Sequence, residues 1–309
     1  MTTIAIDLGG SRIKIGLVAD GKVLKSTMLD ANSGHGLKDR LTTIEDTIRR
    51  LLTKEEIEDT KGIGIAYPGL VNWKEKRVIQ GNGKYTDAPS VDLEKWAKDV
   101  FQLPMIMEND ANAALLGELY YGCGHGAEDA VMLILGTGVG TAAVMGGQLI
   151  RGKHNQAGCL GGHFPTEING RPCTCPGRGC IEANASTWTL PRLIKEHKDY
   201  MQSGLCEEKM IDFKTLKEYV LIQDKVAVDT LDYCTKTWAN CIISLIYAYD
   251  PEVILLSGGV IKFGSILLEP MLEYVKKNVW TPWGKVEFRI AENTEHSVLL
   301  GLHWLLNKS

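Results

Sequence analysis

The chain has 309 residues, of which 44% are hydrophobic and 23% charged, and its formal net charge is −4 at pH 7. This length allows one large domain or two lobes with sizeable cores, and the weak negative charge gives no field that would attract nucleic acid or an anionic membrane. No run approaches the ~18 apolar residues of a membrane span, and the start, MTTIAIDLGG, lacks an export signal. We therefore expect a cytoplasmic α/β protein that binds neither nucleic acid nor membrane, with its thiols reduced.

The predicted elements alternate between β-rich runs and helical patterns along the chain. Strands are predicted at 3–8 (TIAIDL), 12–19 (RIKIGLVA), 22–28, 62–69 (GIGIAYPG), 131–150, where three strands follow one another, and 251–259 (PEVILLSGG). Helices are predicted at 37–53, within 107–118 (MENDANAALLGE), at 224–249 and at 295–306. The order strand, glycine turn, strand occurs near the N-terminus and again after residue 130. This repetition predicts two related lobes with a cleft between them.

Two turns rich in glycine and hydroxyl residues join predicted strands. In such turns the backbone can approach a ligand closely, and its amide groups form a nest for anions. The residues concerned are Asp7, Gly9 and Gly10 in DLGGS, and Gly136, Thr137 and Gly138 in LGTGVGT. A plain hairpin turn explains the first motif equally well when it is taken alone.

The two turns together favour a polyphosphate ligand. Neither is a P-loop, and neither is followed at once by a helix as the dinucleotide fingerprint requires. Asp7, at the end of a strand, could hold a hydrated Mg²⁺. A third glycine pair, Gly258 and Gly259, follows a strand and could admit the flat face of an adenine. Three such turns predict ATP as a ligand.

Asp110 lies where an apolar run enters a predicted helix, between the two phosphate turns in sequence. A kinase that acts on an alcohol needs a carboxylate to accept the hydroxyl proton, and Asp110 is our candidate. Aspartate is also a common helix N-cap, and on the sequence alone that interpretation has equal weight.

A cluster of three cysteines and one histidine has the spacing His163-x9-Cys173-x-Cys175-x4-Cys180. Three thiolates and an imidazole would complete a tetrahedral, structural Zn²⁺ site. The CxC spacing is tighter than the usual CxxC, and a Cys173–Cys180 disulfide is the alternative, which a reducing compartment disfavours. A redox CxxC is absent. The other cysteines are most simply buried apolar residues.

These motifs together resemble the ROK family of sugar kinases, within the actin-like ATPase superfamily. The similar segments are DLGGSRIKIGL, AYPGLV, ENDANAALLGE, LGTGVGTAAV, DPEVILLSGGV and GGHF followed by CTCPGRGCIEANAS. The resemblance implies a two-lobed actin-like ATPase (ribonuclease H-like) fold with an interlobe cleft and a zinc-binding loop. It also implies closure over ATP, Mg²⁺ and a sugar, and frequent assembly as a homodimer.

The resemblance implies roles for individual residues. Asp110 is the base, Asn109 and Glu182 hold sugar hydroxyls, and Gly69 lines the sugar pocket through its backbone. His163 both binds zinc and lies beside the sugar. Ser11 and Arg12 stand where the first phosphate motif usually has Thr-Lys, and we include them in the ATP site. The implied lobes are 1–113, with the C-terminal helix 292–309 packed back on it, and 114–291 with the zinc motif.

One departure from the family pattern concerns the sugar. The family usually carries Glu-x-Gly-His, and that Glu bonds the sugar near its anomeric end. Here the position holds Leu160, or Cys159 if one residue is inserted, so the carboxylate is missing. We therefore expect a preferred sugar altered at C1 or C2 rather than plain glucose. His154 or Asn155 could compensate, although loop residues without such a role are the simpler interpretation.

The predicted function is an ATP-dependent kinase that phosphorylates a hydroxyl, the 6-OH, of a hexose or hexose derivative. One alternative is a sugar-responsive ROK repressor, but the first strand starts at Thr2 or Thr3, which leaves no room for a preceding helix-turn-helix. The other is a sugar-binding protein without catalysis, which the presence of Asp110 and both phosphate turns disfavours.

Overall fold

The structure, a computed structural model, describes residues 2–81, 83–291 and 294–308. The chain forms two compact units: unit 1 comprises Met1–Glu128, Ala142–Cys159 and Ala291–Ser309, and unit 2 comprises Asp129–Thr141 and Leu160–Ile290. The predicted boundary after residue 113 differs, because it would cut the continuous helix α4 (Asp110–Tyr121), most of whose residues are buried. The prediction also missed the return of 142–159 to unit 1.

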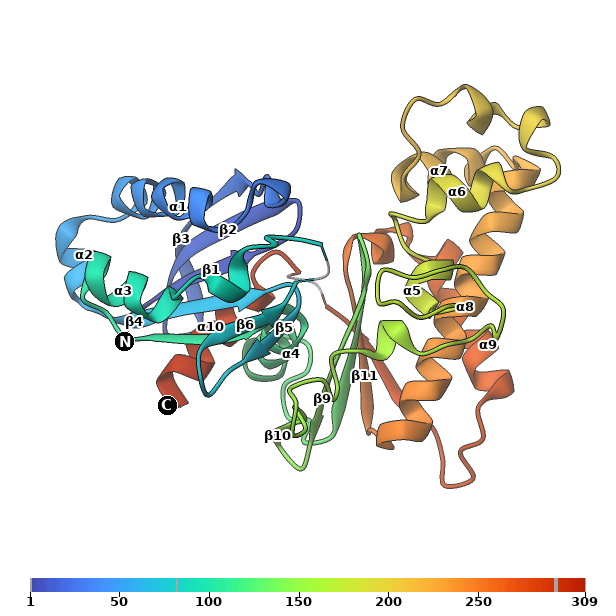
Figure 1. Ribbon diagram of the computed structural model, residues 1–309. Helices are drawn as coiled ribbons and strands as arrows, with labels where there is room; N and C mark the ends of the chain where they lie inside the picture. The colour runs from blue at the N-terminus through green and yellow to red at the C-terminus, as the bar shows by residue number, and fades with distance from the viewer. Residues whose placement is uncertain (1, 82, 292–293, 309) are drawn as a thin grey trace. The chain divides into compact units, whose positions relative to one another are not determined.

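Unit 1 is built on a five-stranded mixed sheet of order β3-β2-β1-β4-β7 (Figure 1). The two predicted N-terminal strands are confirmed, and they form a hairpin in which β1 pairs antiparallel with β2 from Thr2↔Ala19 to Leu8↔Ile13. β1, β4 and β7 run parallel. The strands of unit 1's sheet are β1 (Thr2–Leu8), β2 (Arg12–Ala19), β3 (Lys22–Asp30), β4 (Thr60–Tyr67) and β7 (Met105–Asn109), and a separate hairpin joins β5 (Leu70–Asn72) to β6 (Arg77–Gln80).

Alternation along β1 separates two cores on the two faces of this sheet. Ile4, Ile6 and Leu8 join one buried cluster, whereas Ala5 joins the other, because successive side chains in a strand point to opposite faces. The first cluster includes residues of α1 (Lys38–Leu51) and α3 (Leu93–Phe101), and the second includes residues of α4 and α10 (Ser297–Lys308). A short helix, α2 (Lys54–Glu58), begins with a capping box.

Helices α4 and α10 cross at unusually short range. A Cβ on Gly117 would come within 1.9 Å of the Ser297 carbonyl oxygen, and a Cβ on Gly301 within 1.8 Å of the Ala113 carbonyl oxygen. Neither position can therefore carry a side chain without separating the helices. This contact fixes the C-terminal helix on α4, whose first residue is Asp110.

The second sheet has the order β10-β9-β8-β11-β12, and in it β8, β11 and β12 run parallel. Its strands are β8 (Ala130–Leu135), β9 (Val139–Met145), β10 (Gln148–Leu149), β11 (Val253–Ser257) and β12 (Glu287–Ile290). The helices of unit 2 are α5 (Ile181–Asn184), α6 (Leu190–Lys195), α7 (Phe213–Leu221), α8 (Lys225–Tyr249) and α9 (Ser265–Asn278). In the described part of the chain, no helix combines the length and apolarity needed to cross a membrane.

Candidate active site

The parallel strands of unit 1 bring three sequence-predicted segments to one edge of the sheet. Asp7 of β1 pairs with Ala66 of β4, and Tyr67 of β4 pairs with Asn109 of β7, so the three strands end side by side. Ligands bind outside the carboxyl ends of parallel strands in open α/β sheets. The turn after β1, the Pro68-Gly69 turn after β4 and the start of α4 therefore meet at this edge.

Asn109 and Asp110 have different roles at the start of α4: Asn109 caps the helix, and the Asp110 carboxylate does not. Asn109 is the N-cap of α4, because its Oδ1 accepts a hydrogen bond from the Asn112 amide at 3.1 Å. Its Nδ2 donates to the Gly69 carbonyl at 3.1 Å and to Asp110 Oδ1 at 3.0 Å. Asp110 is thus the first residue of the helix rather than its cap, which answers the alternative raised by the sequence.

The electrostatics of Asp110 suit a proton acceptor. Burial raises the pKa of its carboxyl, and the charge of Lys84 and hydrogen bonds from Ala111 and Asn109 oppose that rise without cancelling it. Burial likewise raises the pKa of Asp7 from 3.8 to about 7; the nearby charge of Asp110 adds to this and Lys14 opposes it. Two carboxylates in one partly desolvated place are a strong candidate for cation binding and acid–base chemistry.

Lys84 is a site residue that the sequence analysis missed. Its side chain lies over the first glycine turn, so closely that a Cβ on Gly10 would come within 2.6 Å of Lys84 Cε. The neighbouring Tyr85 hydroxyl donates to the Gly9 carbonyl at 3.0 Å and so fixes this loop on the turn. No spacing rule marks Lys84, because only the fold brings its loop to the end of β1. Ser11, in the same turn, and Arg12, the first residue of β2, are exposed.

Cys159 closes the loop of residues 151–159 in unit 1. Burial raises the pKa of its thiol to about 12, and the negative charges of Asp110 and Glu108 contribute. Cys159 therefore lies within electrostatic reach of the candidate base and stays neutral at physiological pH. His154 is exposed, and Asn155 has a left-handed backbone with φ of 59°.

In unit 2, parallel strands bring the other two glycine turns together. β8 and β11 are neighbours with Ser257 paired to Ile134, so the turn at Gly136–Gly138 and the pair Gly258–Gly259 follow adjacent strand ends. The Thr187 hydroxyl donates to the Gly136 carbonyl at 2.8 Å and anchors the first of these turns. The predicted phosphate turn and the predicted adenosine glycines therefore lie at neighbouring strand ends in this unit.

Glu182 lies against the same turn. Its Oε2 accepts a hydrogen bond from the Val139 amide at 2.9 Å, and its Oε1 accepts one from the Thr174 hydroxyl at 3.5 Å. Thr174 belongs to the cysteine segment, so Glu182 connects that segment to the glycine turn.

The four predicted metal ligands converge in unit 2. The donor atoms of His163, Cys173, Cys175 and Cys180 all lie within 4.8 Å of one another. The Cys175 and Cys180 sulfur atoms are 3.6 Å apart, and Cys173 Sγ is 3.5 Å from His163 Nδ1. Four ligands at ~2.3 Å in a tetrahedron are separated by ~3.8 Å, so both the chemistry and the spacing fit Zn²⁺. All eight cysteines are free thiols, which does not support the disulfide alternative.

A glycine with a left-handed backbone closes this cluster. Gly179 has φ of +68°, and a Cβ there would approach the Glu167 carbonyl oxygen to 1.8 Å. The turn brings Cys180 back to the segment that carries Cys173, whose amide donates to the Gly177 carbonyl at 3.0 Å. Burial raises the pKa of the Cys173 and Cys180 thiols, so that without a cation they would stay protonated.

Comparison with known proteins decides the family. Residues 3–309 match the ROK family as a whole. A glucokinase of Thermotoga maritima is 33% identical over 283 residues, which cover 88% of this chain and 86% of the glucokinase. The chain belongs to the ROK family. A crystal structure of a ROK family glucokinase from Streptomyces griseus, in complex with glucose and AMPPNP, has a TM-score of 0.84 at 26% identity and covers 100% of both chains. The predicted actin-like α/β fold is confirmed.

The ROK family also contains regulators among the relatives of this chain. The xylose repressor of Bacillus subtilis is 25% identical over 288 residues, which cover 91% of this chain and 70% of the repressor. Family membership therefore establishes the fold, which kinases and repressors share. The similarity to glucokinases is what indicates an ATP-dependent sugar kinase.

Two residues are candidates for the position of the missing ROK glutamate. Leu160 and Cys159 were both open on the sequence. The pKa of the Cys159 thiol is raised in part by the charges of Asp110 and Glu108, so Cys159 lies within their electrostatic reach in unit 1. Leu160 instead precedes a short helical turn at Gly161–His163 that leads to the metal cluster. If Cys159 holds this position, a neutral thiol replaces the ROK carboxylate.

Proposed function

We propose that this protein transfers the γ-phosphate of ATP to the 6-hydroxyl of a hexose or hexose derivative. It is an ATP-dependent sugar kinase, as its ROK membership and its similarity to glucokinases indicate. The observation that carries the finer proposal is Asp110 at the carboxyl edge of the unit 1 sheet, with a raised pKa, beside a glycine turn and Lys84. This placement supports a base next to a phosphate site.

Asp110 would accept the proton of the attacking hydroxyl. A raised pKa makes its carboxylate a stronger base, provided that it is ionised at the working pH. Asn109 holds Asp110 Oδ1 with its amide while capping the helix, which orients the carboxylate. We assign Asn109, the Gly69 backbone, His163 and Glu182 to binding the sugar hydroxyls.

ATP would be held by the glycine turns. The amides of Gly9, Gly10, Gly136, Thr137 and Gly138 are assigned to the phosphates, and Gly258 and Gly259 to the adenosine. Asp7 is assigned to Mg²⁺ through bound water. Mg²⁺ would neutralise charge that develops on the transferred phosphoryl group, and binding it would favour the ionised form of Asp7.

We assign the four-residue cluster to one structural Zn²⁺ per chain. Thr174, between two of the proposed ligands, donates to Glu182, and His163 would itself be a ligand. Zinc would therefore order two of the residues assigned to the sugar without taking part in the chemistry.

Two measurements test the proposed function. The first is ADP release in a coupled assay over hexoses, N-acetylhexosamines and ketoses, with the phosphorylated position identified by NMR. The second compares Asp110→Asn with Asp99→Asn, an exposed aspartate of the same unit that pairs with Lys95. We expect Asp110→Asn to lose turnover by ~10²-fold or more and Asp99→Asn to keep it.

A wild-type protein that releases no ADP with any sugar, yet binds one, would instead support a sugar-responsive regulator, the class to which the xylose repressor belongs. Near wild-type turnover of Asp110→Asn with the best sugar would show that Asp110 is not the base. Phosphorylation at another hydroxyl would support the kinase activity but contradict the assignment of the 6-OH as the acceptor.

A further inference from the structure

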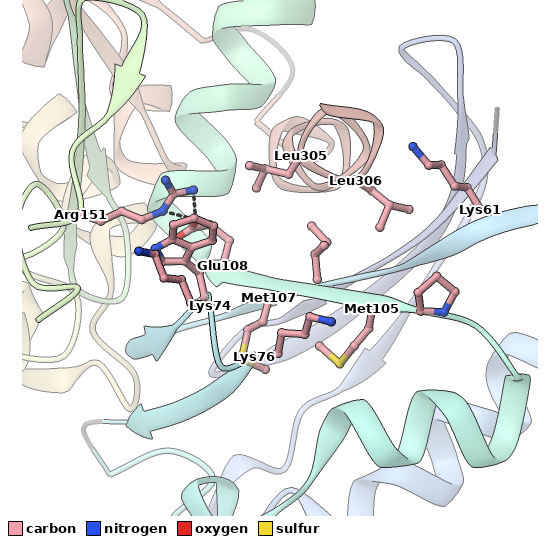
Figure 2. Close-up of a pocket in the computed structure, with 12 residues that line it drawn as sticks. Lys61, Lys74, Lys76, Met105, Met107, Glu108, Arg151, Leu305 and Leu306 are labelled. Carbon is pink, nitrogen blue, oxygen red and sulfur yellow. Dashed lines mark hydrogen bonds and ion pairs between the residues drawn. The ribbon is translucent and has the colours of Figure 1, made fainter. Parts of the chain in front are cut away.

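A buried ion pair lies immediately before the candidate base. Glu108, in β7, is 2% exposed, and its Oε2 accepts hydrogen bonds from Arg151 Nε at 2.8 Å and Arg151 Nη2 at 2.6 Å (Figure 2). The guanidinium also lies 4.4 Å from the centroid of the Trp73 ring. Two hydrogen bonds to one carboxylate oxygen and the contact with the Trp73 ring fix the position of the arginine more tightly than a single contact would.

The second carboxylate oxygen of Glu108 acts on the start of α4. Its Oε1 accepts hydrogen bonds from the Asn109 amide at 2.9 Å and from Asn112 Nδ2 at 3.0 Å. One carboxylate therefore holds both the residue that precedes Asp110 and the first turn of the helix. Burying a charge in this way is costly unless the charge is fully paired, as it is here.

Arg151 is the first residue of the 151–159 loop. Its carbonyl accepts a hydrogen bond from the Ala157 amide at 3.1 Å, so the same residue that pairs with Glu108 also shapes the loop. The loop ends at Cys159, whose thiol is influenced by Asp110 and Glu108. The ion pair thus joins the loop to the end of β7.

Side-chain packing does not fill the space beside this pair. A cavity of about 550 Å³ lies there, lined by Glu108 and Arg151 together with residues of β7 and the C-terminal helix (Figure 2). Met105 and Met107 line it from β7, and Leu306 from α10.

We propose that Glu108 and Arg151 are positioning residues that set the distance between two segments of the sugar site, Asn109–Asp110 and the loop that ends at Cys159. The inference rests on the proposed function, with Asn109 binding the sugar and Cys159 at one of the two positions that align with the ROK glutamate. Neither residue takes part in the phosphoryl transfer. The pair acts by holding the two segments together, so its loss weakens the sugar site and leaves the ATP site intact.

The test separates positioning from folding with two variants and a control. Arg151→Met leaves the buried carboxylate unpaired and will lower Tm. Glu108→Gln combined with Arg151→Met removes both charges while Gln can still accept the Asn109 and Asn112 hydrogen bonds. Lys95→Met, which breaks an exposed pair with Asp99 in the same unit, is the control. For each, Tm, kcat, KM for ATP, KM for the best sugar and calorimetric Kd for that sugar are measured.

We expect the double variant to regain most of the lost Tm while sugar KM and Kd stay raised on the order of tenfold, with KM for ATP changed less than about twofold. Sugar binding that recovers together with Tm would make the pair merely structural and overturn the inference. A folded Arg151→Met protein that binds sugar like the wild type would overturn it as well. Because Kd needs no turnover, a protein that fails as a kinase still tests the inference.

Discussion

Cys159 should decide which sugar this kinase prefers, and Cys159→Glu is the substitution that tests it. With one inserted residue, the glutamate of the ROK pattern, which accepts hydrogen bonds from the sugar near its anomeric carbon, aligns with Cys159. The wild-type thiol has a pKa of about 12, so it is neutral at physiological pH and a weak acceptor. We therefore expect wild-type protein to prefer a sugar altered at C1 or C2, and Cys159→Glu to shift the preference toward glucose.

The size of the shift follows from one polar contact. A buried hydrogen bond that is gained or left unmade is worth about 1–3 kcal/mol, which corresponds to roughly 5- to 150-fold in kcat/KM. The new carboxylate would stand near Asp110 and Glu108, which already influence Cys159. A like charge at this place raises the pKa of Asp110, so the acidic limb of the pH–rate profile should move to higher pH in the variant.

The assay compares kcat/KM for glucose with values for fructose, mannose, allose and N-acetylmannosamine, in wild type, Cys159→Glu and Cys159→Gln. The glutamine variant has nearly the same shape without the charge, so it isolates the carboxylate. A wild-type protein that favours glucose by tenfold or more, about 1.4 kcal/mol, would refute the premise. An unchanged glucose ratio in folded Cys159→Glu would refute the role of this position.

Three further predictions concern the metal cluster, the phosphate turn and pH. Cys175→Ser should lose its zinc and unfold at lower temperature, and protein purified without chelators that contains no zinc by elemental analysis would contradict the assignment. Lys84→Met should lower kcat by about tenfold or more with little change in sugar KM, since its ammonium lies over Gly10; equal kcat in stopped assays would exclude a role in catalysis. The pKa of Asp7 is raised from 3.8 to about 7 in the native protein. Between about pH 4 and 7, native Asp7 therefore keeps a proton that the same residue has lost in the unfolded chain. The free energy of unfolding should consequently fall as pH rises across that window. Urea titrations without nucleotide should show this fall flattened in Asp7→Asn, and an undiminished fall in that variant would rule out Asp7 as its source.

Local sequence patterns were sufficient to predict those features of the structure that a few neighbouring residues determine. The hairpin of β1 and β2, the helices α1 and α8 and the convergent metal ligands follow from periodicity, turn residues and ligand spacing. Asp110 was identified because a helix start after an apolar run is a local signal. Even here the cap belongs to Asn109, since hydrogen-bond direction depends on the backbone angles of the individual residue.

Other elements were not predicted because their local sequence patterns are weak. The sequence predicts no helix where α9 lies, and Pro270 inside it removes a backbone donor and normally disfavours a helix interior. β12 is a short edge strand that contains Glu287 and Arg289, so it lacks an apolar run. Both are stabilised by the elements on which they pack rather than by their own composition.

By itself, the sequence determined the family, the order of the main strands and helices, and which residue types could bind phosphate, sugar and zinc. Only the tertiary structure decided that Lys84 lies over Gly10, that Arg151 pairs with Glu108, and that the charges of Asp110 and Glu108 reach Cys159. These contacts join residues separated by tens of positions, and parallel pairing of β1, β4 and β7 is what brings their segments to one edge. No local spacing records such pairing, because strand order is set by the burial of two opposite sheet faces, a property of the whole unit.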